Sequence, residues 1–252
     1  MRTINKRSLI ILALTGTLII VSACNLGEIR KSKELVATSV PPVVEPVDLS
    51  PFQNIGCTWQ SDAYAVCPEG STPKKMGCDT LSLAPVYLNL LDENSQFIKC
   101  SYAPQLQTPP DEGEVKGLYD SGCSIPFYER ILTYKDGDYL LIRDIEDLKY
   151  YFAPIDSENK ALGYAIAATG FSPRYTFEDT ENYRFLTEDL EPTQIKTGDQ
   201  NYEINLFEYQ LCGCGPHTYY MKRVNVSLSG DIEILDSIPV FENPKEDNLC
   251  VD

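Results

Sequence analysis

The densest group of chemically capable side chains lies close to the C-terminus, where Cys212, Cys214 and His217 fall within one short stretch. Two thiolates and an imidazole could bind zinc, but no fourth ligand is evident beside them. A C-x-C pair could exchange disulfides if one thiol were exposed and had a lowered pKa. A free thiolate next to the imidazole could also act as a nucleophile.

A structural role is the interpretation that we favour for this loop. Gly213, Gly215 and Pro216 separate its cysteines and histidine, and such residues are typical of a chain that turns between strands. Both cysteines would then form disulfides with distant partners. We expect Cys250, two residues from the end of the chain, to pair with one of them. A binding or redox loop remains the alternative, and we predict no metal site.

Catalytic motifs are scarce elsewhere in the chain. His217 is the only histidine, so a Ser-His-Asp or Cys-His site would have to use it. The sequence has no G-x-S-x-G elbow, H-E-x-x-H motif, P-loop or dinucleotide fingerprint. Paired carboxylates could support glycosidic chemistry, but among 37 Asp and Glu residues chance pairs are expected. We therefore assign no catalytic residues and no cofactor.

Two aromatic clusters, Tyr150-Tyr151-Phe152 and Tyr219-Tyr220, could line a recognition surface, because tyrosine suits sites that are apolar at one end and wet at the other. The alternative, which we favour, is that one ring of each cluster faces the core.

The chain has nine cysteines, and the eight that follow Cys24 form an even set. An even number of cysteines in an exported chain predicts a disulfide framework, here of four bridges whose pairing stays open. A reduced protein with zinc-binding thiolates is the alternative, which the lack of repeated C-x-x-C pairs disfavours. The eight residues are Cys57, Cys67, Cys78, Cys100, Cys123, Cys212, Cys214 and Cys250.

The N-terminus explains why the ninth cysteine stands apart. Three basic residues precede a predominantly apolar run over residues 9–21, which has the length of a signal-peptide core and is short for a membrane span. The segment Val21-Ser22-Ala23-Cys24 that follows resembles the lipobox of bacterial lipoproteins.

The resemblance implies that residues 1–23 are a signal peptide, cut before Cys24, and that this cysteine carries a diacylglyceryl group. Several acyl chains give stable anchoring. Asn25 favours delivery to an outer membrane, since aspartate at this position tends to retain Gram-negative lipoproteins at the inner membrane. We therefore expect an extracytoplasmic protein held on the cell membrane or outer membrane by lipid at Cys24.

The charge of the chain limits its partners. Removing residues 1–23 takes away three basic residues and no acid, so the formal net charge changes from −16 to −19. Such a surface repels nucleic acid and anionic lipid head groups, and we expect neither as a partner. The sequence also lacks a calcium loop of the D-x-[DN]-x-[DN]-G type.

The pattern along the mature chain predicts a tether followed by folded parts. Residues 24–51 comprise the lipidated cysteine and a Pro-rich segment without apolar periodicity, which is typical of an extended spacer. Residues 52–123 hold five of the eight cysteines and predict a Cys-rich β part. Within it, residues 86–91 and 96–102 could form a hairpin.

Residues 124–252 predict an α+β part that could form one domain with the preceding residues. Strand-like runs flank Asp136-Gly137, a strong hairpin signal. Asp144 can cap a short helix that ends before Pro154. A second helix over residues 157–169 is apolar nearly all round and should be buried.

Four alternating runs then predict an antiparallel meander packed on the buried helix. They cover residues 192–196, 202–211, 220–228 and 232–240. The expected fold is thus a disulfide-rich α+β fold with a Cys-rich N-terminal part. Its element order is similar to that of cystatin-like folds, a weak analogy that carries no function.

These features favour a non-enzymatic binding or interaction module with an unidentified envelope or extracellular partner, such as a protein, a glycan or another envelope component. Two alternatives stay open. One is a structural protein of the envelope, and the other is a thiol-disulfide or carboxylate-dependent envelope enzyme.

Overall fold

Residues 36–103, 116–177 and 182–252 are described by the computed structural model. The predicted signal peptide, Cys24 and the start of the tether lie outside the described residues. Among the residues described, no helix is long and apolar enough to cross a membrane.

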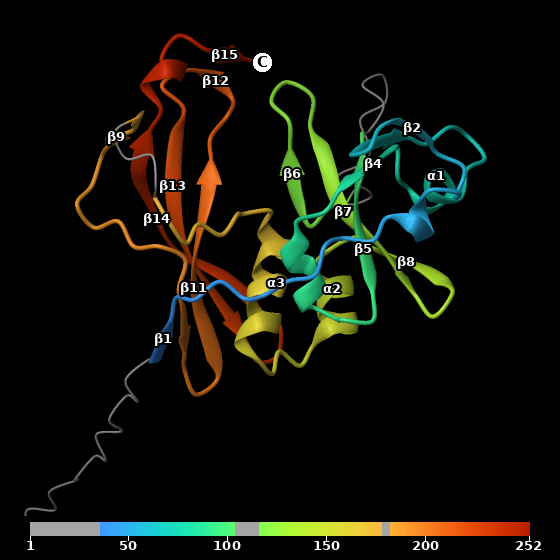
Figure 1. Ribbon diagram of the computed structural model, residues 1–252, viewed down its shortest axis with the longest axis horizontal. Coiled ribbons are helices and arrows are strands. Elements are labelled where there is room, and N and C mark those ends of the chain that lie inside the picture. The colour runs from blue at the N-terminus through green and yellow to red at the C-terminus, as the bar shows by residue number, and fades with distance from the viewer. Residues whose placement is uncertain (1–35, 104–115, 178–181) are drawn as a thin grey trace, which may run out of the picture. The chain divides into compact units, whose positions relative to one another are not determined.

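The first of two antiparallel sheets, the N-terminal sheet, has the strand order β2-β3-β4-β5-β7-β6, and β8 also pairs with β7 (Figure 1). It is followed along the chain by helices α2 (Ile145–Phe152) and α3 (Glu158–Thr169). The strands are β2 (Thr58–Ser61), β3 (Tyr64–Val66), β4 (Thr80–Leu83), β5 (Gln96–Tyr102), β6 (Tyr119–Ser121), β7 (Phe127–Lys135) and β8 (Asp138–Ile142).

The second sheet, the C-terminal sheet, has the order β1-β10-β11-β13-β14-β9. Its long central strands pair antiparallel with their neighbours and confirm the predicted meander. The two antiparallel sheets together with the helices confirm an α+β fold. The strands are β1 (Val36–Thr38), β9 (Arg184–Phe185), β10 (Ile195–Thr197), β11 (Asn201–Tyr209), β13 (Thr218–Ser227) and β14 (Ile232–Glu242). A separate pair joins β12 (Gly213–Cys214) to β15 (Cys250–Val251).

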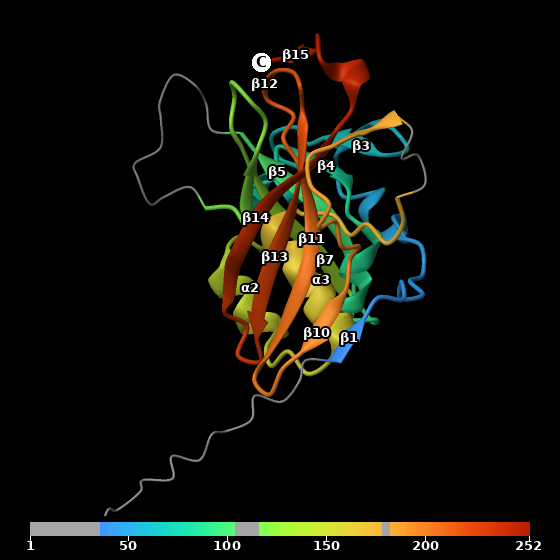
Figure 2. The same ribbon diagram turned by 90° about the vertical axis from the view of Figure 1, so that its left-hand side faces the viewer.

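Helix α3 lies between the two sheets, behind the C-terminal sheet in Figure 2. As its composition predicts, it is buried over Ala161–Ala168. Its side chains share one core with residues of both sheets, including Phe97 and Val224. The Ser157 hydroxyl caps the helix by accepting from the N–H of Lys160. The helix therefore binds the two sheets into one folded unit, Lys33–Asp252.

The predicted hairpin and short helix are also confirmed. Asp136 and Gly137 both have positive φ between β7 and β8, which suits the right-handed twist of a hairpin. The Asp144 carboxylate accepts from the N–H of Asp147 at 2.9 Å and so caps α2.

The hairpin predicted over residues 86–91 and 96–102 is wrong. Its first half is a 3₁₀ helix, η2 (Val86–Leu90), and β5 pairs with β4 and β7 instead. Leu88 and Leu91 are both buried, and a spacing of three residues places them on one side of a 3₁₀ turn. This turn packs closely on α3, where a Cβ at Gly163 would lie 2.8 Å from the carbonyl oxygen of Tyr87.

The end of the predicted tether is part of the folded unit. Strand β1 pairs with β10, so the chain is already in a sheet at Val36. Farther along, Asn89 donates to the carbonyl of Glu45, and the Tyr139 hydroxyl donates to the carbonyl of Pro51 at 2.5 Å. The boundary expected at residues 123 and 124 likewise separates β6 from β7, which are neighbours in one sheet. These contacts join the end of the tether and both expected parts within one folded unit.

All eight cysteines after Cys24 form the predicted four disulfides. Two are local to the N-terminal sheet, one joins loops of the two sheets, and one ties down the C-terminal tail. The pairs are Cys57–Cys67, Cys78–Cys100, Cys123–Cys212 and Cys214–Cys250. Four disulfides indicate folding in an oxidising, extracytoplasmic environment.

Candidate functional site

The loop with the densest chemistry in the sequence is a disulfide junction. Cys212 is bonded to Cys123, which lies between β6 and β7, and Cys214 is bonded to Cys250 as we expected. The cysteines therefore offer no thiolate for catalysis or metal binding in this oxidised structure. Within the described ranges, no cluster of three or more His, Cys, Asp or Glu side chains could hold a metal ion.

His217 is embedded in the same junction, with 2% of its surface exposed. Its Nδ1 lies 3.2 Å from the carbonyl oxygen of Gln210, and its Nε2 lies 3.0 Å from that of Leu249. The ring thus connects the end of β11 to the C-terminal segment. Because both nitrogens face backbone oxygens inside the protein, a substrate has no access to them.

Buried carboxylates are occupied with folding contacts. Glu129 is buried in β7, where it accepts from the hydroxyls of Ser101 at 2.7 Å and Ser121 at 2.5 Å. The ammonium of Lys99 lies 3.3 Å away. Such partners offset the cost of burying the charge. Sequence reasoning did not single out this residue, and its contacts explain its burial without a catalytic role.

The predicted aromatic surfaces divide between core and solvent. Phe152 is buried in the main core, whereas Tyr150 and Tyr151 are exposed. Tyr219 packs into a smaller core on the far side of the C-terminal sheet, stacked on Phe241 with ring centroids 4.6 Å apart. One ring of each cluster therefore faces a core, which is the alternative that we favoured.

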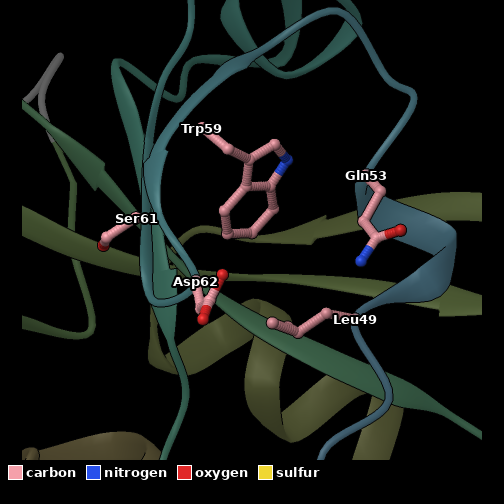
Figure 3. Close-up of a pocket in the computed structure, with 5 residues that line it drawn as sticks. All are labelled: Leu49, Gln53, Trp59, Ser61 and Asp62. Atoms are coloured by element: carbon pink, nitrogen blue, oxygen red, sulfur yellow. The ribbon is translucent and has the colours of Figure 1, made fainter.

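A pocket beside the N-terminal sheet gathers a different set of side chains (Figure 3). It has a volume of about 410 Å³, within the ~300–1,000 Å³ range of small-molecule sites. The indole of Trp59 forms one wall, and Figure 3 shows Gln53 across from it with Asp62 and Leu49 below. Ser61 also lines the pocket, but its hydroxyl points away from the other side chains.

Two separate segments hold these side chains in place. Trp59, Ser61 and Asp62 belong to the hairpin of β2 and β3, whose open end is closed by the Cys57–Cys67 disulfide. A register shift after Trp59 marks a bulge, which can re-aim side chains at a sheet edge.

The opposite wall is carried by the short 3₁₀ helix η1 (Ser50–Phe52). Phe52 is fully buried in the core beneath the N-terminal sheet, and it fixes Leu49 and Gln53 on either side of it. This wall of the pocket is therefore anchored in the core by Phe52, although the polar side chains of the pocket are exposed.

Trp59 gives the pocket its most specific feature. Its Nε1 is buried and has no hydrogen-bond partner among the described residues. An unmade hydrogen bond of this kind costs about 1–3 kcal/mol, so an acceptor on a ligand would stabilise the site once the indole turns its N–H toward the pocket. The exposed carboxylate of Asp62 and the amide of Gln53 add polar groups around an apolar indole face. Such a site suits a small molecule with one apolar face and several hydroxyl or amide groups.

Sequence reasoning did not find this pocket. Trp59 is the only tryptophan, and that singularity was the one available signal. Leu49 and Gln53 lay in or beside the predicted tether, which gave no reason to place them against a strand.

Comparison of the chain with models of protein families, with curated proteins and with solved structures finds no match. The cystatin-like analogy therefore remains a prediction based on element order.

Proposed function

We propose that this chain is a non-enzymatic binding protein outside the cytoplasm, held on a membrane by lipid at Cys24, and that its Trp59 pocket binds one sugar unit of a glycan. The observation that carries the proposal is the buried, unpartnered Nε1 of Trp59 in a pocket that also presents a carboxylate and an amide. A sugar ring offers an apolar C–H face for the indole and hydroxyls that can accept from its N–H once the indole turns toward them.

The single tryptophan makes the experiment direct, because intrinsic tryptophan fluorescence reports on this pocket alone. We would titrate the folded protein with soluble oligosaccharides of several backbones, including chitin, cellulose, starch and peptidoglycan fragments. A saturable change in emission with at least one of them is the expected result. No change with any of them, confirmed by calorimetry, would contradict the proposal.

Matched variants separate binding in the pocket from binding elsewhere. Asp62→Ala and Gln53→Ala remove polar groups that face the pocket, and we expect each to weaken binding by about tenfold. Ser61→Ala is the control, since its hydroxyl points away, and it should bind as tightly as the unaltered protein. Trp59→Phe keeps an aromatic face but removes the N–H, so its binding, measured by calorimetry, should also fall.

The anchor is a separate part of the proposal and has its own measurement. The lipobox-like segment and the four disulfides support export and lipidation together. We expect the intact mass of membrane-extracted protein to equal a chain that starts at Cys24 plus acyl groups. A mature chain with that start and no acyl mass would overturn the anchor and leave the pocket untouched.

The thiol-disulfide alternative makes an opposite prediction for the C-terminal loop. An enzyme of that class needs at least one accessible thiol during its cycle. We propose instead that Cys212 and Cys214 stay bonded in the native protein. Thiol labelling under native conditions should therefore modify neither of them, and rapid labelling of either would favour the enzyme.

A further inference from the structure

Strand β14 has a long open edge. On one side it pairs with β13 from Ile232 to Glu242. On its other side it pairs with β9 only at Phe241 and Glu242, and Leu186 donates to the carbonyl of Val240. In the part of the chain that the structure describes, no strand pairs with this side over residues 232–239. Figure 2 shows this part of β14 along the left-hand edge of the C-terminal sheet.

The open edge is apolar where an ordinary surface strand would be polar. Ile234 and Leu235 are 48% and 44% exposed. Ile234 pairs in register with Val224, which is buried toward α3, so Ile234 is on the face that looks toward the other sheet. The alternation of strand side chains places Glu233 on the opposite face.

A pocket of about 520 Å³ opens directly beside this edge. Ile232 and Ile234 form its wall on the β14 side, and residues in or next to β6, α2, α3 and β11 form the rest. The pocket is mostly apolar, with two carboxylates among its lining residues. The remaining residues that line it are Leu118, Tyr119, Asp120, Ile145, Ala168, Thr169, Phe171 and Glu208.

Acidic groups dominate the surroundings of the edge. Glu233 and Asp236 are exposed on β14 itself, and Asp120 is exposed at the pocket. Glu208 is balanced by Lys222 at 2.8 Å, and Arg223 lies opposite Asp236 in the sheet. Two copies of this edge placed side by side would bring their carboxylates together, which disfavours pairing of the chain with itself. The charge instead suits a basic partner.

We propose that the open edge of β14 is a docking site for an extended, basic segment of another protein, which adds a strand to the C-terminal sheet and inserts one apolar side chain into the adjacent pocket. Backbone hydrogen bonds supply affinity in this mode of recognition, and the side-chain pocket supplies specificity. The site is distinct from the Trp59 pocket, and each can fail without the other.

A synthetic peptide of alternating valine and lysine is the probe, about eight residues long so that it spans the edge at ~3.3 Å per residue. The matched control peptide has the same charge but proline at alternate positions, so that it lacks every second backbone donor and cannot form a continuous ladder. We expect the first peptide to bind and to slow amide hydrogen exchange over residues 232–238. The control peptide should bind at least about tenfold more weakly.

Protein variants test the pocket and the charge separately. Ile234→Asp puts a charge at the mouth of the pocket, and Glu233→Lys/Asp236→Lys reverses the charge of the edge; each should weaken binding by about tenfold or more. Glu93→Lys/Asp138→Lys makes the same change of charge on exposed residues away from β14 and should have little effect. Hydrogen exchange of the β11 and β13 amides, measured on the same variants, shows whether the C-terminal sheet stays folded in each of them.

Three results would overturn the proposal. Equal binding of the proline peptide would reduce the interaction to charge attraction without strand addition. Binding that leaves exchange over residues 232–238 unchanged would place the peptide elsewhere. A dimer that forms without peptide and is lost in Ile234→Asp would make a second copy of the chain the occupant of the edge.

Discussion

The two sheets of this protein are stabilised in different ways. In the N-terminal sheet, β2, β3 and β4 have only three or four residues each, and two disulfides lie within the sheet region. In the C-terminal sheet, β11, β13 and β14 have nine to eleven residues each, and the cysteines near them lie in loops and the tail.

The difference extends to the cores. The core beneath the N-terminal sheet contains Cys67, Cys78 and Cys100 among its buried residues, so covalent bonds take part in its packing. The core around α3 is built from aliphatic and aromatic side chains without cysteine. Short strands bury little apolar surface and need covalent support, whereas a helix packed on long strands does not. The comparison teaches that disulfides take part in the packing of the core beneath the N-terminal sheet, whereas the core around α3 is formed by apolar side chains of both sheets.

The strongest test concerns the bond that joins the two regions. Cys123–Cys212 closes a loop of 89 residues between a β6–β7 loop and a β11–β12 loop. In the chain-entropy description a loop of this length stabilises the folded state by about 4.5 kcal/mol. We expect Cys123→Ser/Cys212→Ser to lower the free energy of unfolding by about that amount, as measured by urea unfolding without reductant. Cys212 is exposed, so little core packing is lost.

As a control, the folded Cys123→Ser/Cys212→Ser variant should give the same spectroscopic β-sheet signal as the unaltered protein. A loss of less than about 1 kcal/mol would mean that the unfolded chain already keeps the two regions close together without the bond, so that the bond removes little entropy from it. The contrast between covalent and apolar stabilisation would then apply within each sheet but not between them.

The next test removes apolar area from the core between the sheets. Leu162 is fully buried on α3. Truncation of a buried leucine to alanine costs about 2–5 kcal/mol through lost transfer energy and the cavity that remains. We expect Leu162→Ala to cost about 3 kcal/mol by urea unfolding. Leu235→Ala on the exposed part of β14 is the matched control and should change stability by less than about 0.5 kcal/mol.

The same contrast explains what could be predicted from the sequence. The hairpin at Asp136-Gly137, helices α2 and α3 and the meander have long periodic patterns with capping residues, and the structure confirms them. Residues 86–91 form a short apolar run, which fits a strand or a 3₁₀ turn equally well. Packing on α3 decides for the turn, and a local pattern does not contain that contact.

The Trp59 pocket and the pairing of β1 were missed for a related reason. Strand β1 pairs with the distant strand β10, and the pocket forms where the end of the predicted tether folds back on the nearby β2–β3 hairpin; Pro-rich composition gives no periodic signal for such contacts. The number of disulfides followed from an even cysteine count, but their pairing did not, because eight cysteines allow ~105 arrangements. Tertiary packing selects one of them.

A local disulfide provides the third test of the contrast. Cys57–Cys67 closes a loop of only 10 residues at the base of the β2–β3 hairpin. We expect Cys57→Ser/Cys67→Ser to lower the free energy of unfolding by about 2.5 kcal/mol, less than the loss of the long-range bond. Hydrogen exchange should become faster in β2 and β3 while β11 and β13 keep their protection. Faster exchange in both sheets would show that the regions unfold together and would remove the distinction.

The smallest expected effect on stability comes from the charge of Asp144, which caps α2, and it depends on pH. Partial burial acts to raise the pKa of Asp144, but the hydrogen bond from the N–H of Asp147 and the ammonium of Lys116, 3.0 Å away, together hold this pKa below its ordinary value. A carboxylate with a lowered folded-state pKa stabilises the protein above the unfolded-state pKa of about 4. That stabilisation is lost as the pH falls through the folded-state pKa.

We therefore expect Asp144→Ala to cost about 1 kcal/mol at neutral pH and progressively less as the pH falls from about 5 toward 2. Ser157→Ala removes the equivalent cap from α3 without a titrating group, so its cost should be similar in size and independent of pH. Urea unfolding of both variants over this pH range measures the difference. Parallel pH profiles would mean that the Asp144 charge does not stabilise α2 and that its cap acts through hydrogen-bond geometry alone. Helices α2 and α3 would then be stabilised by apolar packing and by cap hydrogen bonds whose strength does not depend on charge.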